Sequence, residues 1–404
     1  MPACYNSSVN RQAGIYIHIP FCARKCTYCA FNTTDYFEDL AARYVDAVGR
    51  EIHAWGARLA ESNLHRTAVD TIYFGGGTPS IVEAEQLGAL VAACREAFAV
   101  APDAEVTIEI NPATLTREKI AGWLAAGINR ASVGVQSFID EELSGLSRTH
   151  TATEARRTVA ALREAGFANI SLDLIAGLPA QSLKDWRFNL EEALRLDPEH
   201  LSLYLLEVKE GTQLYAQLKR GKLARPDDDT AAEMYRIICD ATRRAGYEQY
   251  EISNFARLEP EPYKGMGSAP SRFRSRHNMK YWTGAPFFGM GCGAHSYDGQ
   301  ARWVNILKSE SYIAAIDKNG EAIAERHDLS AEDRAAEALF MQLRLNEGVA
   351  LEAFRDEYGL DVLARFGDEL PRLAEADLIQ IRDGRIMLTN KGRLLSNEVF
   401  VSLI

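Results

Sequence analysis

Three cysteines in one short segment could bind a metal cluster. Cys22, Cys26 and Cys29 follow the strand-like run Gly14–Ile19 in the spacing C-x₃-C-x₂-C. Thiolates are the usual protein ligands of iron–sulfur clusters, and three of them can hold three irons of a [4Fe–4S] cluster. The fourth iron then keeps an open position, which is typical of reactive metal sites. A structural zinc site is the competing interpretation, but no fourth Cys or His follows Cys29 at ligand spacing.

Composition limits the classes of protein to which the chain can belong. The 404 residues are 47% hydrophobic and 25% charged, as in ordinary globular proteins. No apolar stretch approaches the roughly 20 residues that span a bilayer, and the N-terminus has no signal-peptide pattern, so we expect a cytoplasmic protein. The seven cysteines do not form a disulfide pattern. The net charge of −11 argues against nucleic-acid binding.

The elements that would position the cysteines alternate between strands and helices from residue 14 to about residue 250. The expected strands are Gly14–Ile19, Val69–Phe74, Glu105–Ile110, Arg130–Val135, Asn169–Leu174 and His200–Leu205. Segments with helical periodicity lie between them, among them Tyr36–Leu59, Glu83–Phe98, Thr153–Ala165 and Leu183–Leu196. Strand–helix alternation predicts parallel βαβ units. Six such units predict an α/β fold with a partial (β/α)₆ barrel.

Residues suited to ligand binding follow several of these strands. The cysteines follow the first strand and the run 75–79 (GGGTP) follows the second. Glu109, Gln136 and Asp173 stand at the ends of the third, fourth and fifth strands. Barrel folds assemble their active sites at the carboxyl ends of the strands. The sequence therefore predicts one shared site at that face.

With this pattern the chain resembles the radical S-adenosyl-L-methionine (SAM) family, in which SAM binds the open iron of the cluster. The run 16–22 (YIHIPFC) resembles the branch of the anaerobic coproporphyrinogen III oxidases and their relatives. The resemblance implies a backbone cradle for the methionyl group, two side chains for its charged ends, two ribose ligands and two flanking tyrosines. The cradle residues are Gly76, Gly77 and Thr78, and the side chains for the charged ends are Glu109 and Arg148. The ribose ligands are Gln136 and Asp173, and the flanking tyrosines are Tyr16 and Tyr28.

Two departures from the oxidases resemble the haem-chaperone branch of this family. The oxidases have a fourth cysteine where this chain has Phe31, and they have a long N-terminal extension where this chain has 13 residues before Gly14. The segment 277–282 (HNMKYW) fits the H-N-x-x-Y-W motif that the resemblance associates with haem, through His277, Asn278, Tyr281 and Trp282. A neutral imidazole is a good axial ligand of haem iron, and aromatic rings offer flat faces to a porphyrin.

A run of cations surrounds this motif. No Asp or Glu lies between Tyr263 and Tyr297, where the chain carries Lys264, Arg272, Arg274, Arg276 and Lys280. We expect this basic loop to neutralise the propionates of haem, because arginine binds carboxylates in a bidentate manner. The alternative is a solvated loop and a histidine that packs locally.

The chain divides into four expected parts. They are a disordered N-terminus (1–13), the partial barrel (14–255), the basic loop with the haem motif (256–300) and a smaller α+β domain resembling a winged helix (301–404). In the last part acidic residues outnumber basic ones by 19 to 13, so it would repel nucleic-acid phosphates. We expect it to be a lid or a docking module for a partner.

Three functions remain open on the sequence. The resemblance favours a haem chaperone that binds a [4Fe–4S] cluster, SAM and haem and delivers haem to an acceptor protein, with a homodimer and a peripheral position at the membrane left open. The second is a radical SAM enzyme, either an oxygen-independent coproporphyrinogen III oxidase or another enzyme that modifies tetrapyrroles after reductive cleavage of SAM. The third is a cluster-and-haem protein that never cleaves SAM.

Overall fold

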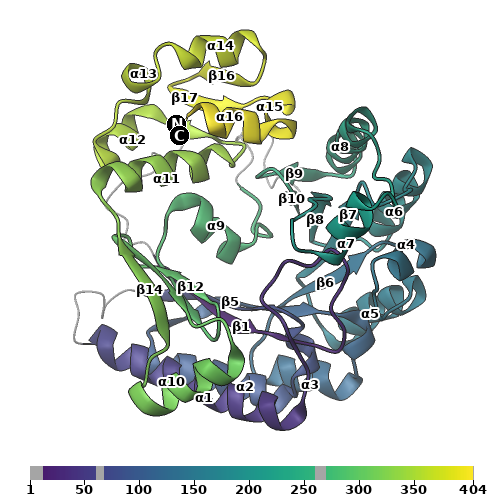
Figure 1. Ribbon diagram of the computed structural model, residues 1–404, viewed down its shortest axis with the longest axis vertical. Helices are drawn as coiled ribbons and strands as arrows, with labels where there is room; N and C mark the ends of the chain where they lie inside the picture. The colour runs from purple at the N-terminus through teal and green to yellow at the C-terminus, as the bar shows by residue number, and fades with distance from the viewer. Residues whose placement is uncertain (1–11, 61–67, 260–269, 404) are drawn as a thin grey trace.

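The computed structural model describes residues 12–60, 68–259 and 270–403. The expected disordered segment 1–13 lies mostly outside these residues, and Ala13 already begins the first strand. Most of the chain forms one large sheet with its helices, and the C-terminal elements form a second body that faces it across α9 (Figure 1). Each of the two parts has its own hydrophobic core.

The strands and helices follow each other in the expected alternation. The strands are β1 (Ala13–Ile19), β2 (Phe21–Cys22), β3 (Thr34–Asp35), β4 (Val69–Gly76), β5 (Val100–Ile110), β6 (Arg130–Gln136), β7 (Ile170–Ala176), β8 (His200–Leu205), β9 (Tyr247–Gln249), β10 (Asn254–Arg257), β11 (Phe287–Met290), β12 (His295–Tyr297), β13 (Ala301–Asn305), β14 (Ile323–Asp328), β15 (Val349–Ala350), β16 (Ile379–Arg382) and β17 (Arg385–Leu388). The helices are α1 (Glu38–Ala60), α2 (Ala84–Ala97), α3 (Arg117–Ala125), α4 (Asp140–Gly145), α5 (Ala152–Ala165), α6 (Leu183–Arg195), α7 (Gln213–Lys219), α8 (Asp228–Arg244), α9 (Arg276–Thr283), α10 (Ser309–Asn319), α11 (Ala331–Leu343), α12 (Leu351–Tyr358), α13 (Val362–Arg365), α14 (Glu369–Glu375), α15 (Asn390–Leu394) and α16 (Ser396–Ser402).

The expected partial (β/α)₆ barrel is confirmed. The main sheet has 12 strands in the order β14-β13-β12-β11-β1-β4-β5-β6-β7-β8-β10-β9. Strands β1, β4, β5, β6, β7 and β8 are parallel neighbours in chain order. The helices between them cross the outer face of the curved sheet (Figure 1). All carboxyl ends of these six strands therefore meet at one edge, as the sequence predicts.

The alternation of side chains along β1 separates the two faces of the sheet. Ile15, Ile17 and Ile19 have no exposed surface and belong to the core under the helices. Tyr16 and His18 point to the opposite, inner face, because successive strand residues alternate in direction. This inner face is the wall on which the candidate site is built.

The main sheet continues beyond the six barrel units. Strand β11 pairs in parallel with β1, and β12, β13 and β14 follow it in antiparallel order. The expected start of the C-terminal domain at residue 301 therefore lies within the main sheet. The second core begins at Ala338, on α11.

The C-terminal elements combine helices with a small three-stranded sheet, in the order β15-β17-β16. The hairpin of β16 and β17 turns at Asp383 and Gly384, whose φ angles of 52° and 69° fit a two-residue hairpin turn. After the hairpin the chain forms two short helices, α15 and α16. Among the described residues no helix is long and apolar enough to span a membrane.

Candidate SAM and haem site

The cysteine loop leaves β1 and is held against neighbouring segments by its backbone. Phe21 and Cys22 pair in parallel with Thr34 and Asp35, which closes the loop at its base. At its middle, the Thr27 N–H donates to the Leu146 carbonyl (3.1 Å) and the Thr27 carbonyl accepts from the Leu214 N–H (2.8 Å). Three separate segments thus fix the position of the loop.

The donor set of this loop fits an iron–sulfur cluster. Cys22, Cys26 and Cys29 are half-buried free thiols. The Thr78 hydroxyl donates to the Cys22 sulfur and the Arg148 guanidinium to the Cys26 sulfur, each at 3.5 Å, and such donors stabilise bound thiolates. Burial raises the pKa of Cys22 and of Cys29, so the free thiols are protonated at neutral pH and a bound metal would displace these protons.

A single metal ion does not explain the arrangement as well. Within the described parts of the chain, no three His, Cys, Asp or Glu side chains stand close enough together to bind one ion. Thiolates that bind different irons of one cluster lie farther apart than the ligands of a single ion. In this conformation the three thiols do not form a compact site for a single ion within the described residues.

The glycine run at the end of β4 approaches both the cysteine loop and Glu109. The Gly77 N–H donates to the Ile19 carbonyl (2.8 Å), and a Cβ at Gly77 would lie 2.6 Å from the Pro20 carbonyl oxygen. The Gly76 N–H donates to one Glu109 oxygen (3.1 Å) and the Tyr73 hydroxyl to the other (2.9 Å). Burial raises the pKa of Glu109 to about 7, against the opposite effect of these hydrogen bonds.

Gln136, Arg148 and Asp173 lie on the next two strands and their loops. Gln136 has a φ of 65°, a left-handed conformation that turns the chain at the end of β6. A Cβ at Gly134 would meet the Gln136 amide nitrogen at 2.9 Å and the Arg148 guanidinium at 3.4 Å, so these two side chains converge. The Asp173 carboxylate accepts the Ser132 hydroxyl (3.1 Å). Tyr28 packs beside Leu146, Ile175 and Leu178.

The expected SAM residues therefore converge at one edge of the barrel, beside the cysteine loop. The arrangement brings carboxylates and an arginine together, which is what a zwitterionic ligand requires. Tyr16 stands between Gly75 and α9: its ring lies 3.0 Å from a Cβ built at Gly75, and its centroid lies 6.3 Å from that of His277.

The helix that carries the haem motif lies inside the barrel. Ser275 caps its start by accepting a hydrogen bond from the Asn278 N–H (3.3 Å). The His277 ring is 1% exposed and stacks on Tyr73 at 5.0 Å. Its Nδ1 bonds the Thr71 hydroxyl (2.8 Å) and its Nε2 the Tyr281 hydroxyl (3.0 Å). Burial, and next the charge of Lys280, lower the pKa of His277 to about 3, so the imidazole is neutral.

The described cations around the motif pair with carboxylates of the protein, although the sequence between Tyr263 and Tyr297 contains no Asp or Glu. Arg274 pairs with Glu248 (2.8 Å) and Glu347 (2.6 Å). Arg276 pairs with Asp70 (3.2 Å), and Lys280 contacts the same carboxylate.

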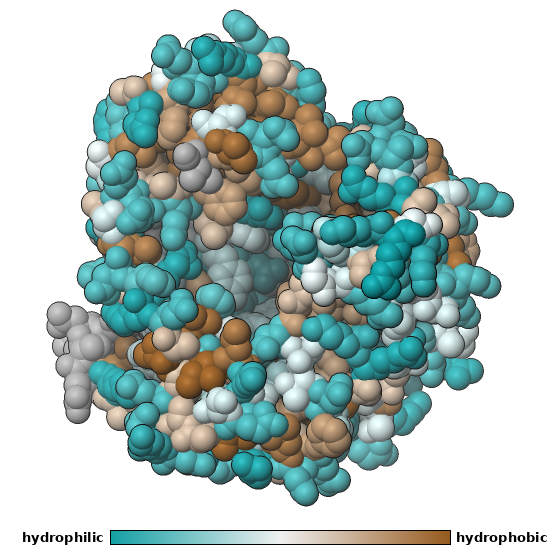
Figure 2. Space-filling model, in the orientation of Figure 1, coloured by the Kyte–Doolittle hydropathy of each residue, from teal (hydrophilic) through white to brown (hydrophobic). Residues whose placement is uncertain are grey.

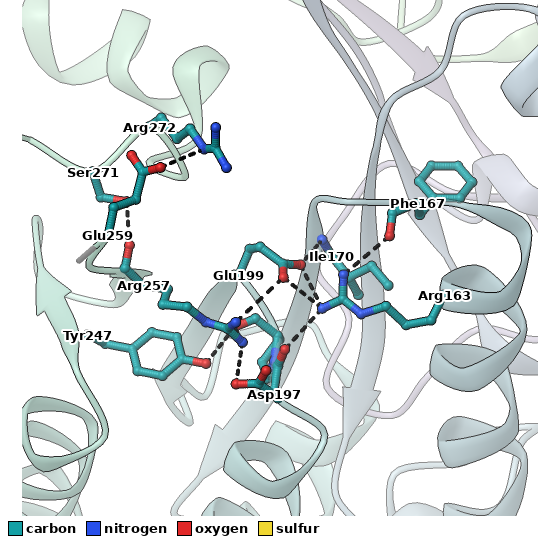
Figure 3. A network of polar contacts seen from close by, with 11 residues as sticks. Arg163, Phe167, Ile170, Asp197, Glu199, Tyr247, Arg257, Glu259, Ser271 and Arg272 are labelled. Atoms are coloured by element: carbon teal, nitrogen blue, oxygen red, sulfur yellow. Dashed lines mark hydrogen bonds and ion pairs between the residues drawn. The ribbon is translucent and has the colours of Figure 1, made fainter. Parts of the chain in front are cut away.

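Arg272 is paired as well. It contacts Glu259 at 3.1 Å, and the neighbouring Ser271 hydroxyl donates to the Arg257 carbonyl (2.6 Å), as Figure 3 shows. Lys264 lies outside the described residues. The described cations of the loop thus brace it against the barrel and the C-terminal elements.

Several residues of the site carry no motif and were not expected. Tyr73 bonds Glu109 and stacks on His277, and Thr71 bonds the same imidazole. Arg130 is 2% exposed on the inner face of β6. Burial raises the pKa of Glu109 and of Asp173, and the charge of Arg130 partly opposes this effect. Their inward direction follows from strand alternation, so the strand assignment could have identified them.

Comparisons with known proteins agree with this geometry. Residues 16–193 match the family model of the radical SAM superfamily, and residues 329–395 match that of the HemN C-terminal domain. The Bacillus subtilis protein named heme chaperone HemW is 37% identical over 95% of this chain and 97% of its own length. A Bos taurus protein named radical S-adenosyl methionine domain-containing protein 1, mitochondrial, is 33% identical over 98% of this chain and 88% of its own.

The fold also has a counterpart among solved structures. The Escherichia coli coproporphyrinogen III oxidase HemN, described as a radical SAM enzyme, superposes with a TM-score of 0.81 at 24% identity, over 97% of this chain and 90% of that one. At this identity the likeness concerns the fold. Membership in the superfamily implies a [4Fe–4S] cluster and SAM, for which the three thiols and the edge of the barrel are suited. The chain belongs to the radical SAM superfamily and, within it, to the HemW family.

Proposed function

We propose that the protein is a haem chaperone of the radical SAM type. It binds a [4Fe–4S] cluster through Cys22, Cys26 and Cys29, and SAM through the residues gathered around Glu109. It binds haem at α9 and passes it to an acceptor protein. When bound, the cluster and SAM supply one-electron chemistry; whether the protein uses that chemistry is separate from haem binding.

One observation carries the proposal beyond the names of the relatives. The helix with the H-N-x-x-Y-W motif packs on the inner face of β1 and β4, the strands whose carboxyl ends carry the cysteine loop and the glycine run. Tyr16 lies between the two places, near both Glu109 and His277. Haem and SAM would therefore share one chamber, so binding of one can affect the other.

For His277 to bind iron, its Nε2 must exchange the Tyr281 hydroxyl for the metal. The neutral imidazole suits this exchange, because metal binding then displaces no proton from the ring. Tyr281 and Trp282 are adjacent rings at 6.3 Å and 70° that could contact a porphyrin. Asn278 follows His277 in the first turn of the helix.

The test is titration of haemin into anaerobically purified protein, followed by its Soret band, for the wild type and His277→Ala. His200→Ala is the matched control: His200 is equally buried and its nitrogens bond the Ser171 and Tyr250 hydroxyls at 2.8 Å each. We expect His277→Ala to lose the ligand-dependent Soret shift and about tenfold in affinity, and His200→Ala to keep both. Equal spectra for all three proteins would refute iron ligation by His277.

A second measurement separates the chaperone from an oxidase. The protein with a reconstituted cluster is incubated anaerobically with coproporphyrinogen III, SAM and a strong reductant. We expect no protoporphyrinogen. Its appearance would make the chain an oxidase, and haem uptake without it supports the chaperone.

A further inference from the structure

Arg344, at the end of α11, differs from the arginines of the basic loop because no carboxylate among the described residues pairs with it. Its guanidinium carbon lies 4.7 Å from the centroid of the Trp282 ring and 5.9 Å from that of Phe400. Among the described residues, its side chain makes neither a hydrogen bond nor an ion pair, and its Nε is buried without an acceptor. A charged group stacked on aromatic rings keeps its N–H donors available in the plane of the guanidinium.

A second unsatisfied donor lies in the same contact. The indole Nε1 of Trp282 is buried and has no acceptor within the part of the chain that the structure describes. A buried N–H without an acceptor costs free energy, and an acceptor supplied by a ligand removes that cost. The two donors come from different parts of the protein, one from α9 and one from the end of α11.

The acidic groups near Arg344 form no ion pair with it within the described residues. Glu251 is 1% exposed and already accepts the Ser253 N–H (3.2 Å) and the Asn254 amide. Burial lowers the pKa of Arg344, and the charges of Glu251, Glu207 and Tyr204 oppose this effect. Tyr204 and Glu207 stand at the carboxyl end of β8, so Arg344 faces the same edge of the barrel as the SAM residues.

Trp282 lies on α9 and Arg344 directly follows α11, two helices that lie near a hollow of the molecule (Figure 1). Figure 2 shows a hollow in the middle of the molecule, where Figure 1 shows α9 between the barrel strands and the C-terminal elements. Arg344 and Trp282 belong to the two bodies that meet there. A ligand in this hollow would contact the motif helix on one side and α11 on the other.

We propose that Arg344, together with the indole N–H of Trp282, binds a carboxylate of the ligand that the motif helix receives. This inference rests on the proposed function, in which that carboxylate is a haem propionate. Carboxylate oxygens accept hydrogen bonds from guanidinium and indole donors, and the pairing with arginine is charge-assisted. The C-terminal elements then supply the propionate contact that the paired arginines of the basic loop cannot supply.

The experiment compares haemin with haemin dimethyl ester, in which both propionates have lost their charge. Wild-type protein and Arg344→Leu are titrated with each compound under anaerobic conditions. We expect the wild type to prefer haemin by about tenfold or more, and Arg344→Leu to lose this preference while binding the ester unchanged. Trp282→Phe keeps an aromatic face without the N–H and should lose part of the preference.

The matched control is Arg326→Leu. Arg326 also stacks on an indole, Trp303, at 5.2 Å, but it is paired with Asp328 (3.4 Å) and Asp298 (3.6 Å). This variant should keep the full preference for haemin. The inference is overturned, but not the proposed function, if Arg344→Leu retains the preference for haemin or has an equally reduced affinity for both compounds. A wild type that binds neither compound overturns the proposed function, and this inference with it.

Discussion

At the scale of single residues, Glu109 joins the glycine run to the barrel interior. Its carboxylate accepts hydrogen bonds from Tyr73 and Gly76, and its burial raises its pKa to about 7. A carboxyl with this pKa is partly protonated near neutral pH. In the proposed site it has to be ionised to pair with the ammonium group of SAM.

We therefore predict that SAM affinity rises with pH up to about 7 and is constant above it. Below that pH, Glu109 has to release its proton for the ion pair to form. Glu109→Gln should lower the affinity by about tenfold at high pH and abolish the pH dependence. Titration calorimetry with SAM on cluster-reconstituted protein, between about pH 6 and pH 8, measures both effects.

The control for this prediction is Glu51→Gln. Glu51 is another buried glutamate whose pKa burial raises to about 7, but it bonds the Gly291 N–H (2.8 Å) and the Tyr312 hydroxyl (2.6 Å), away from the glycine run. It should keep the pH dependence of the wild type. An unchanged pH profile in Glu109→Gln would exclude this role of Glu109.

Residue types and order along the chain predict part of the set of side chains at the barrel edge. Glu109, Gln136 and Asp173 were expected at strand ends, and the structure brings them together. The sequence did not indicate that both nitrogens of His277 are already bonded. Thr71, one of the two partners, lies 206 positions away along the chain, and no sequence motif identifies its hydroxyl as a partner of His277.

At the scale of elements, the turn between β11 and β12 holds the strand that leads into the cysteine loop. The Tyr44 hydroxyl donates to the His18 carbonyl (2.9 Å) and accepts the Cys292 N–H (2.8 Å). The Asn32 amide donates to the Leu307 carbonyl (2.8 Å), and the Asn32 carbonyl bonds His18 Nε2 (2.9 Å). The segments before and after the cysteines are thus fixed to the added strands.

Gly291 is the position at which this arrangement is most sensitive. Its φ is 96°, and an added Cβ would contact the Tyr44 hydroxyl and lie 2.7 Å from the His18 carbonyl oxygen. We predict that Gly291→Ala costs at least about 3 kcal/mol, of which about 1–2 kcal/mol comes from the left-handed backbone and the rest from crowding. It should also reduce the iron bound after reconstitution, because His18 lies on the strand that enters the loop.

Gly299→Ala separates the two causes. Gly299 has nearly the same φ, 97°, but an added Cβ there meets no atom of the described residues within 4 Å. It should cost only about 1–2 kcal/mol and leave the iron content unchanged. Thermal unfolding and iron analysis compare the two variants; equal losses in both would show that the turn does not support the loop.

The barrel strands were predictable from sequence, whereas the added strands were not. Six runs of β-rich residues alternate with helical segments, and this alternation can be recognised in the sequence without knowing which strands pair. Strands β11 and β12 are short. Strand β11 (Phe287–Met290) pairs with Gly14–Ile17, and most of the barrel lies between these two segments in the sequence. A pairing across that separation leaves no local pattern in the sequence.

At the scale of the whole molecule, the barrel and the C-terminal elements are joined through the loop that was expected to bind propionates. Arg274 donates to both oxygens of Glu248 at 2.8 Å each and to Glu347 at 2.6 Å. These partners lie 26 and 73 positions away along the chain. The absence of Asp and Glu from the local sequence therefore suggested free cations, although distant carboxylates neutralise them.

We predict that Arg274→Met destabilises the protein by about 3 kcal/mol, because it leaves Glu248 partly buried without its counter-charge. The side chains of Arg274 and Glu248 are only 15% and 19% exposed. Arg272→Met is the control: Arg272 is 71% exposed in its pair with Glu259, and such surface pairs contribute at most about 1 kcal/mol. Chemical denaturation of both variants gives the difference in the free energy of unfolding.

Arg274→Met should also separate unfolding of the C-terminal elements from unfolding of the barrel, because Glu347 follows α11. One shared unfolding transition at unchanged stability would contradict the bracing role of Arg274.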